Sequence, residues 1–209
     1  MRVVAALLCL LSMSALGAPA AAEPMTFKRA AAGPGGPATV WIAAEGEIAD
    51  KTADEFKAFL ARERIASEAA VGGFAVYLNS AGGSVRGAIR LGYAIRAAGF
   101  DTRVAGTLPK KDAPRFDAEA PGRCYSACAI AFLGGQSRNA ATRTLGIQHS
   151  ELAPGPAERA EETARLLAVY VARMGIDAQF LTLAASSGQP GVYLFRADEL
   201  RRLAITGRP

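Results

Sequence analysis

The segment Leu78-Asn79-Ser80-Ala81-Gly82-Gly83-Ser84 joins an apolar strand pattern over residues 74–78 to a helical pattern over residues 84–98. Two adjacent glycines let the backbone turn tightly and expose an N–H where the helix begins. Such an N–H suits an oxyanion or a phosphate. The segment lacks the Lys-Ser/Thr that ends a P-loop, so it does not predict nucleotide binding. Taken alone, it is also typical of an ordinary strand-to-helix turn.

Two later junctions add reactive side chains. The sequence Cys124-Tyr125-Ser126-Ala127-Cys128 precedes the apolar stretch 129–133, which places Ser126 near the start of a helix of small residues. Ser126 is a candidate nucleophile there, although a serine at this position is also a common helix N-cap. The predicted strand over 144–148 is followed by His149. It is the only histidine in the chain, so any imidazole base must be this residue.

Strand and helix patterns alternate around these junctions. Further strands are predicted over 39–43, 102–105 and 192–195, and further helices over 157–174, 177–186 and 198–203, with another helix opened by a Thr52/Glu55 capping box. Residues 107–121 hold three prolines and predict a polar surface loop. The alternation predicts an α/β fold with a largely parallel sheet, with sites at the carboxyl ends of its strands.

The order of these motifs resembles the ClpP/crotonase superfamily, a ββα superhelix. The matching segments are the turn Asn79–Gly83, the pair Ser126-Ala127, Gly134-Gly135 with Arg138, and the strand ending in His149. The resemblance runs from about residue 40 to 206, and its closest form is the exported bacterial ClpP-like proteins whose serine is flanked by cysteines.

The resemblance implies a serine peptidase mechanism. It makes Ser126 the nucleophile, His149 the base, and the backbone N–H groups of Gly83 and Ala127 the oxyanion hole. It also implies a peptide or protein substrate, a homo-oligomer, and no cofactor or metal.

Two departures from the family pattern bear on activity. The acidic third member is expected near Gly191-Val192-Tyr193, where the chain has no carboxylate. Asp198, Glu199, Glu151, a backbone carbonyl or a water molecule are the alternatives. The segment 107–121 is an insertion, either a lid or a carrier of Lys110 or Lys111 toward Ser126, as in Ser-Lys peptidases.

The departures keep other functions open. The main alternative is a non-catalytic protein of the same fold that binds a peptide or an envelope partner. A crotonase-like acyl-CoA enzyme is a third reading, which an exported location disfavours because CoA is not expected there. Nucleic acid is not the expected partner, because the basic residues behind the net charge of +5 are dispersed.

The N-terminus predicts export. Arg2, the short apolar run 3–11 and small residues up to Ala22 form a signal-peptide pattern over residues 1–22; an uncleaved anchor is the alternative. Cys9 follows the bulky Leu8 and does not suit a lipoprotein site. We expect a flexible lead-in over 23–37, a single ClpP-like domain over 38–209 and a periplasmic or secreted location, with no membrane span after cleavage.

Cleavage would leave Cys124 and Cys128 as the only cysteines. Four residues apart, they would lie near the outer limit for bridging on a regular helix. Either Cys124 lies just outside the helix and forms a local disulfide, which an oxidising compartment favours, or both thiols are buried and free. The spacing does not match a thioredoxin-like redox motif, and a structural zinc site would need further ligands.

Overall fold

The computed structural model describes residues 23–33, 40–65, 74–148, 157–186 and 191–207. Its main sheet has the order β1-β2-β3-β4-β8, with the bounds Thr26–Ala31, Val40–Glu45, Ala75–Asn79, Asp101–Val104 and Arg138–Asn139. β2, β3, β4 and β8 pair in parallel, and β1 adds an antiparallel edge. The predicted α/β fold with a largely parallel sheet is therefore confirmed.

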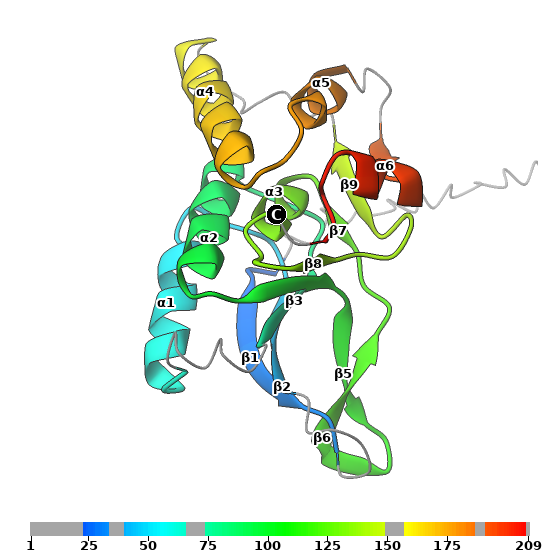
Figure 1. Cartoon of the computed structure of the whole chain (residues 1–209). Helices are drawn as coiled ribbons and strands as arrows, with labels where there is room; N and C mark the ends of the chain where they lie inside the picture. The colour runs from blue at the N-terminus through cyan, green and yellow to red at the C-terminus, as the bar shows by residue number, and fades with distance from the viewer. Residues whose placement is uncertain (1–22, 34–39, 66–73, 149–156, 187–190, 208–209) are drawn as a thin grey trace, which may run out of the picture.

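α1, α2 and α3 lie on one side of this sheet, and α4, α5 and α6 gather at one end of the molecule (Figure 1). Their bounds are α1 Thr52–Arg62, α2 Val85–Ala97, α3 Ala127–Phe132, α4 Ala157–Arg173, α5 Gln179–Ser186 and α6 Ala197–Arg202. α3 is buried throughout, because all six of its side chains are apolar. Gly134 permits a close approach to α2, since a Cβ there would lie 2.2 Å from the carbonyl oxygen of Gly92. The two glycines after α3 thus serve close packing.

A second, three-stranded sheet has the order β10-β9-β7, with the bounds Val192–Leu194, Leu145–Gln148 and Cys124–Tyr125. β7 runs parallel to β9, and β10 is antiparallel to it. A parallel bridge between Ser80 and Cys124 connects the end of β3 to this sheet. The two strand-to-helix junctions singled out in the sequence are therefore neighbours.

Residues 107–121 do not form the predicted polar loop. They lie largely in a hairpin of β5 (Gly106–Lys110) and β6 (Ala113–Ala120), which Figure 1 places at the opposite end of the molecule from α4 and α5. The hairpin packs on β1, β2 and β3. Trp41 donates its indole N–H to Thr107 at 2.8 Å and stacks on Tyr77, so the insertion covers the sheet face opposite the helices.

Two other sequence expectations need correction. The lead-in predicted over 23–37 contains strand β1, because its backbone pairs with β2 along the full length of the strand. The Thr52 capping box does not form: Lys51 is the N-cap, and the Thr52 hydroxyl instead accepts from the N–H of Ala49 at 2.9 Å.

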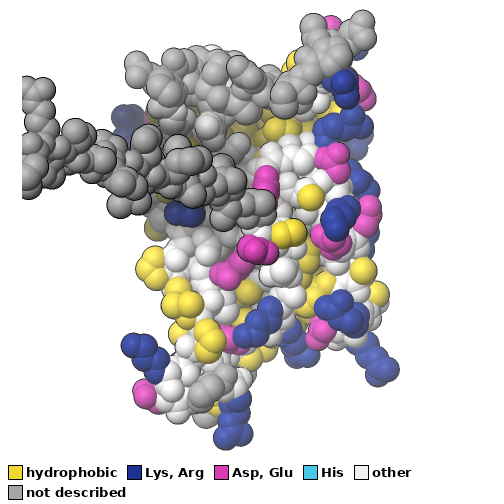
Figure 2. All heavy atoms as spheres, turned by 180° about the vertical axis from the view of Figure 1, so that it is seen from behind, with side chains coloured by type: hydrophobic (Ala, Val, Ile, Leu, Met, Phe, Trp, Pro, Cys, Tyr) yellow, Lys and Arg dark blue, Asp and Glu magenta, His cyan; other side chains and the backbone are white. Residues whose placement is uncertain are grey.

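The surface carries mixed charge. Lys and Arg side chains are interspersed with Asp and Glu on the face shown in Figure 2, which fits the dispersed basic residues of the sequence. Among the described helices, none combines the length and apolar character needed to cross a bilayer.

Candidate functional site

Ser126 lies at a sharp elbow between β7 and α3. Its φ and ψ are 54° and −124°, a region that glycine adopts readily and other residues rarely do. The Ser126 N–H donates to the carbonyl of Gly146 at 3.0 Å, and its side chain makes no capping hydrogen bond to α3. Ser126 is therefore not an ordinary helix N-cap, because a capping hydroxyl would accept a hydrogen bond from a backbone N–H in the first turn of α3.

The glycine turn packs directly against this elbow. A Cβ on Gly82 would lie 2.8 Å from the Ser126 Cβ and 3.3 Å from the Ala127 nitrogen. The φ of Gly82 is +122°, which also favours glycine. The fold thus brings together two segments that are about 40 residues apart in the chain, and only glycine fits at their contact.

Pairing with a third segment orients Gly83. The carbonyl of Gly82 accepts from the Ile48 N–H at 2.8 Å, and the Ser84 N–H donates to the Ile48 carbonyl at 2.7 Å. In this parallel bridge the residue between the two bonds directs its own N–H away from the partner strand. The Gly83 N–H therefore points away from Ile48, and it donates no hydrogen bond to any described residue.

An apolar cavity of about 250 Å³ opens beside Ser126. Its walls come from α2, α3, α4, α5 and β9, and they include Ser126, Ala127, Ile130, Leu167, Phe180 and Gln148. The sequence predicted the helices that supply these walls but not the cavity. The sequence signal for these walls was the helical spacing of Leu167 and the apolar pair Phe180-Leu181. Such patterns indicate that a helix face is buried, but they do not distinguish a cavity wall from a packed core.

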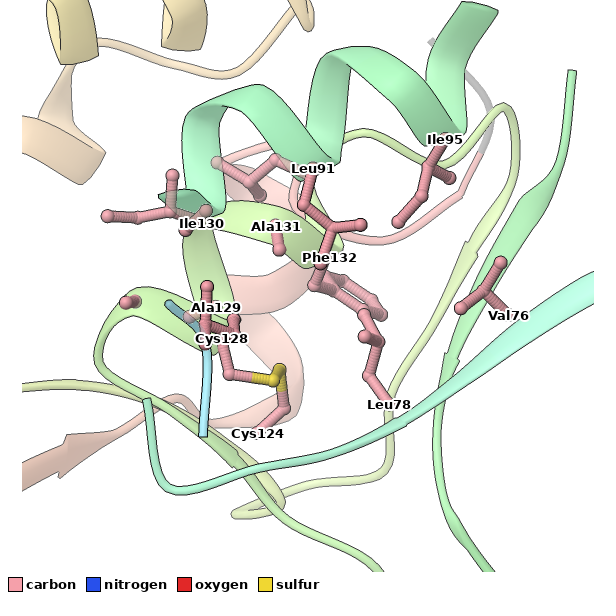
Figure 3. Packing of buried hydrophobic residues seen from close by; sticks show 14 of the residues in the cluster. Val76, Leu78, Leu91, Ile95, Cys124, Cys128, Ala129, Ile130, Ala131 and Phe132 are labelled. Carbon is pink, nitrogen blue, oxygen red and sulfur yellow. A yellow bond between two sulfur atoms is a disulfide. The ribbon is translucent and has the colours of Figure 1, made fainter. Parts of the chain in front are cut away.

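Cys124 and Cys128 form a disulfide, with their Cα atoms 5.0 Å apart. Cys124 belongs to β7 and Cys128 to α3, so the first of the two arrangements left open by the sequence is the one observed. Both cysteines are buried and belong to the main hydrophobic cluster, part of which Figure 3 draws together with the disulfide.

His149 lies outside the described residues, so its predicted role as base stays a prediction. The residue before it, Gln148, lines the same cavity as Ser126. On the neighbouring strand, Val192 pairs with Gln148. Gly191, which precedes Val192, carries no carboxylate, as the sequence indicated.

The nearby acidic residues make local contacts. Glu199 is buried and accepts hydrogen bonds from the hydroxyl of Tyr193 and from the N–H of Arg196. Burial raises the pKa of the Glu199 carboxyl, but these hydrogen bonds and the charge of Arg196 outweigh it and lower the pKa overall. Asp198 is exposed and bonds to Arg196. Glu151 lies outside the described residues.

Neither lysine of the insertion is near the elbow. Lys110 is exposed at the distal end of the hairpin and Lys111 follows it at the turn, far from α3 in Figure 1. The hairpin also does not form a lid over Ser126, because it packs on the far face of the main sheet. Among the described residues, no group of three His, Cys, Asp or Glu side chains is arranged to hold a metal ion.

Arg138, which the sequence linked to the glycine pair after α3, has a structural role. It is buried, and its guanidinium donates to the carbonyls of Ile205 and Ala204, both at 2.9 Å, and of Gly135 at 3.2 Å. Burial lowers the pKa of Arg138 to about 10, so it stays charged at neutral pH. It ties the C-terminal segment to the end of α3.

Comparison with known proteins identifies the fold. The sequence matches no protein-family model and no curated protein. Among solved structures, the chain is similar to the membrane-bound stomatin-specific protease 1510-N, in a lysine-to-alanine mutant bound to a substrate peptide. That pair has 13% sequence identity and a TM-score of 0.50 over 79% of this chain and 71% of the other.

Two ClpP structures are also similar. ClpP1 from Listeria monocytogenes has 16% identity and a TM-score of 0.45, covering 77% of this chain and 84% of that one. The ClpP protease catalytic domain from Plasmodium falciparum has 17% identity and a TM-score of 0.48, covering 77% and 78%. The likeness to the stomatin-specific protease, with its TM-score of 0.50, supports the fold expected from the sequence, and at 13% identity it concerns the fold alone.

Proposed function

We propose that this chain, a protein of ClpP-like fold, is an exported serine hydrolase that acts on peptides or proteins. Ser126 is the nucleophile and His149 accepts its proton. The backbone N–H groups of Gly83 and Ala127 hold the oxyanion of the tetrahedral intermediate. The observation that carries the proposal is the strained Ser126 elbow, which opens on a cavity and packs against the glycine turn.

Each step has support in the described residues. A serine hydroxyl is a weak nucleophile unless a base lies beside it, and β9 leads to the only imidazole from the cavity wall at Gln148. The Gly83 N–H has no described partner, and Ala127 is the first residue of α3, where an N–H has no intrahelical acceptor. Two fixed donors of this kind contribute several kcal/mol of transition-state stabilisation.

The cavity favours an apolar group on the acyl side of the scissile bond. Its lining is aliphatic and aromatic apart from Ser126 and Gln148. An apolar side chain of a peptide substrate would fill it and hold the carbonyl near the Ser126 hydroxyl, which is the positioning that acyl transfer requires.

Labelling with a fluorophosphonate tests the proposal. Wild-type protein is expected to react covalently at Ser126, and Ser126→Ala is expected to lose the reaction while Ser137→Ala, away from the cavity, keeps it. His149→Gln is expected to slow labelling by at least about a hundredfold, because a positioned base contributes that much. Folded wild-type protein that does not label would refute the hydrolase.

One observation favours the non-catalytic alternative. Gly191, which precedes the Val192 paired with the end of β9, has no side chain to orient an imidazole, and Glu199 is engaged by Tyr193 and Arg196. A protein that uses the cavity only for binding would retain apolar peptides without cleaving them, and Ser126→Ala would leave its affinity unchanged. Calorimetric titration of an uncleaved peptide, run beside the labelling assay, separates the two functions.

Export belongs to the same proposal. We expect cleavage after Ala22, so that the mature chain begins at Glu23. Intact mass measurement of protein recovered from a bacterial periplasm checks this boundary. Light scattering of the mature protein checks the expected homo-oligomer.

A further inference from the structure

The disulfide spans the elbow that carries Ser126. Cys124 and Cys128 each lie two residues from Ser126, one in β7 and the other in the first turn of α3. The S–S bond therefore joins the strand that enters the elbow to the helix that leaves it.

The elbow needs such a constraint, because Ser126 has positive φ without being glycine. A conformation of this kind persists only where the surroundings enforce it. The hydrogen bonds that hold it are ordinary backbone bonds to separate segments: Tyr125 N–H to the carbonyl of Ser80 at 3.1 Å, and Ser126 N–H to that of Gly146 at 3.0 Å. The disulfide is the covalent link across the turn.

The bond is also shielded from solvent. Both cysteines are fully buried, and Figure 3 shows them packed among Leu78, Ala129 and Phe132. An external thiol has no access to the sulfur atoms in the folded state. The redox state of the pair is therefore set while the chain folds and is then retained.

We propose that Cys124 and Cys128 are positioning residues, and that their oxidation makes the Ser126 site competent. This inference rests on the proposed hydrolase. The two thiols lose two electrons and two protons to a disulfide-bearing oxidant, such as oxidised glutathione, which becomes two thiols as the S–S bond forms. A chain that folds in a reducing compartment would keep a relaxed elbow and stay inactive, whereas a chain that folds after export and is oxidised as it folds would have a competent site.

The test compares the oxidised full chain with two variants, Cys124→Ala/Cys128→Ala and the better-packed Cys124→Val/Cys128→Ala. Circular dichroism selects a temperature at which all three are folded. The expected result is a fluorophosphonate labelling rate that is lower by about tenfold to a hundredfold in both variants, the size of effect that misplacing a reactive group produces. With an ester substrate, kcat should fall while KM changes little.

Wild-type protein refolded without oxidant supplies the matched control. It should label slowly, and it should recover the full rate when it is refolded with oxidised glutathione, whereas the variants should not respond. Equal labelling rates for folded oxidised and folded reduced protein would overturn the inference and leave the hydrolase intact. Failure of both variants to fold would also overturn it, because the bond would then be a general stabiliser.

Amide hydrogen exchange keeps the inference testable without activity. Exchange at Tyr125–Ala127 should accelerate in the variants, while exchange in α2 stays unchanged. If wild-type protein does not label at all, the proposed hydrolase fails and exchange decides the inference alone: acceleration confined to the elbow supports positioning, and unchanged or uniform exchange refutes it.

Discussion

Replacing Ser126 with glycine should stabilise the protein while abolishing the proposed activity. The φ and ψ of Ser126, 54° and −124°, place its Cβ in a region that side chains disfavour, whereas glycine adopts it freely. Its hydroxyl caps no helix N–H, so removing the side chain forfeits no capping bond. The substitution therefore isolates the backbone cost of placing a nucleophile at this elbow.

The magnitude follows from two opposing terms. A non-glycine residue in such a conformation costs about 1–3 kcal/mol. Glycine gives back about 0.5–1 kcal/mol, because it makes the unfolded chain more flexible. Ser126→Gly should thus raise the free energy of unfolding by about 1 kcal/mol relative to Ser126→Ala, which keeps the Cβ and the strain. For a chain of this size that is a rise in Tm of about 2–4 °C.

Urea denaturation and calorimetry of the two variants measure this difference. Ser137 provides the control, because its φ is not positive. There the order should reverse, with Ser137→Gly less stable than Ser137→Ala by up to about 1 kcal/mol. A Ser126→Gly variant no more stable than Ser126→Ala would refute the argument that the elbow is strained. Greater stability together with lost labelling would show that strain is retained at this site for function.

Three further predictions concern the surroundings of the site. Arg138→Met should lower the free energy of unfolding by about 3–5 kcal/mol in urea denaturation, because buried carbonyls lose a charged donor; a loss below about 1 kcal/mol would contradict that role. The pKa of Glu199 is lowered in the folded state, so its ionised form should stabilise the protein above the ordinary glutamate pKa of about 4.3, and this stabilisation should be lost as pH falls through the lowered pKa. Glu199→Gln should therefore show a smaller loss of Tm on acidification than wild-type protein. A pH profile of Tm that the substitution leaves unchanged would argue against the contact. Lys110→Ala/Lys111→Ala should label at the wild-type rate, because the hairpin lies far from the elbow; a large decrease would revive a Ser-Lys mechanism.

The central strands β2, β3 and β4 of the main sheet, and the helices, could be predicted from sequence because local patterns mark them strongly. Residues 74–78 form an apolar run that ends in a glycine turn, and the helix that follows has an apolar face over residues 85–97. The hairpin at 106–120 could not be predicted in this way, since its prolines and charges are typical of a loop. Its strands are stabilised by partners far away in the chain, such as Trp41 for Thr107 and Lys28 for Asp117.

The errors at β1 and Thr52 have different causes. β1 is an edge strand whose residues are mostly exposed or half-buried, so it lacks the apolar run that marks a central strand. Polar residues in such a strand are compatible with pairing on one side only. At Thr52 the expected pattern was present, but the hydroxyl bonds to Ala49 instead, and the helix begins without a side-chain cap. Pairing with a distant strand thus decided the structure at β1, whereas a competing local hydrogen bond decided it at Thr52.

At the candidate site, the sequence marks the individual motifs, but only the fold brings them together. Sequence order identified Gly83 and Ser126 because glycines and a serine at strand-to-helix junctions are visible locally. Their proximity comes from pairings between distant segments: Ile48 with Gly83, Ser80 with Cys124, and Ser126 with Gly146. Each pairing forms only when the complete fold does, so local unfolding of any one segment would separate Ser126 from the glycine turn. The disulfide across the Ser126 elbow is covalent, so local opening does not break it as it breaks these pairings. This is the physical reason to expect the site to depend on oxidation more strongly than the overall fold does.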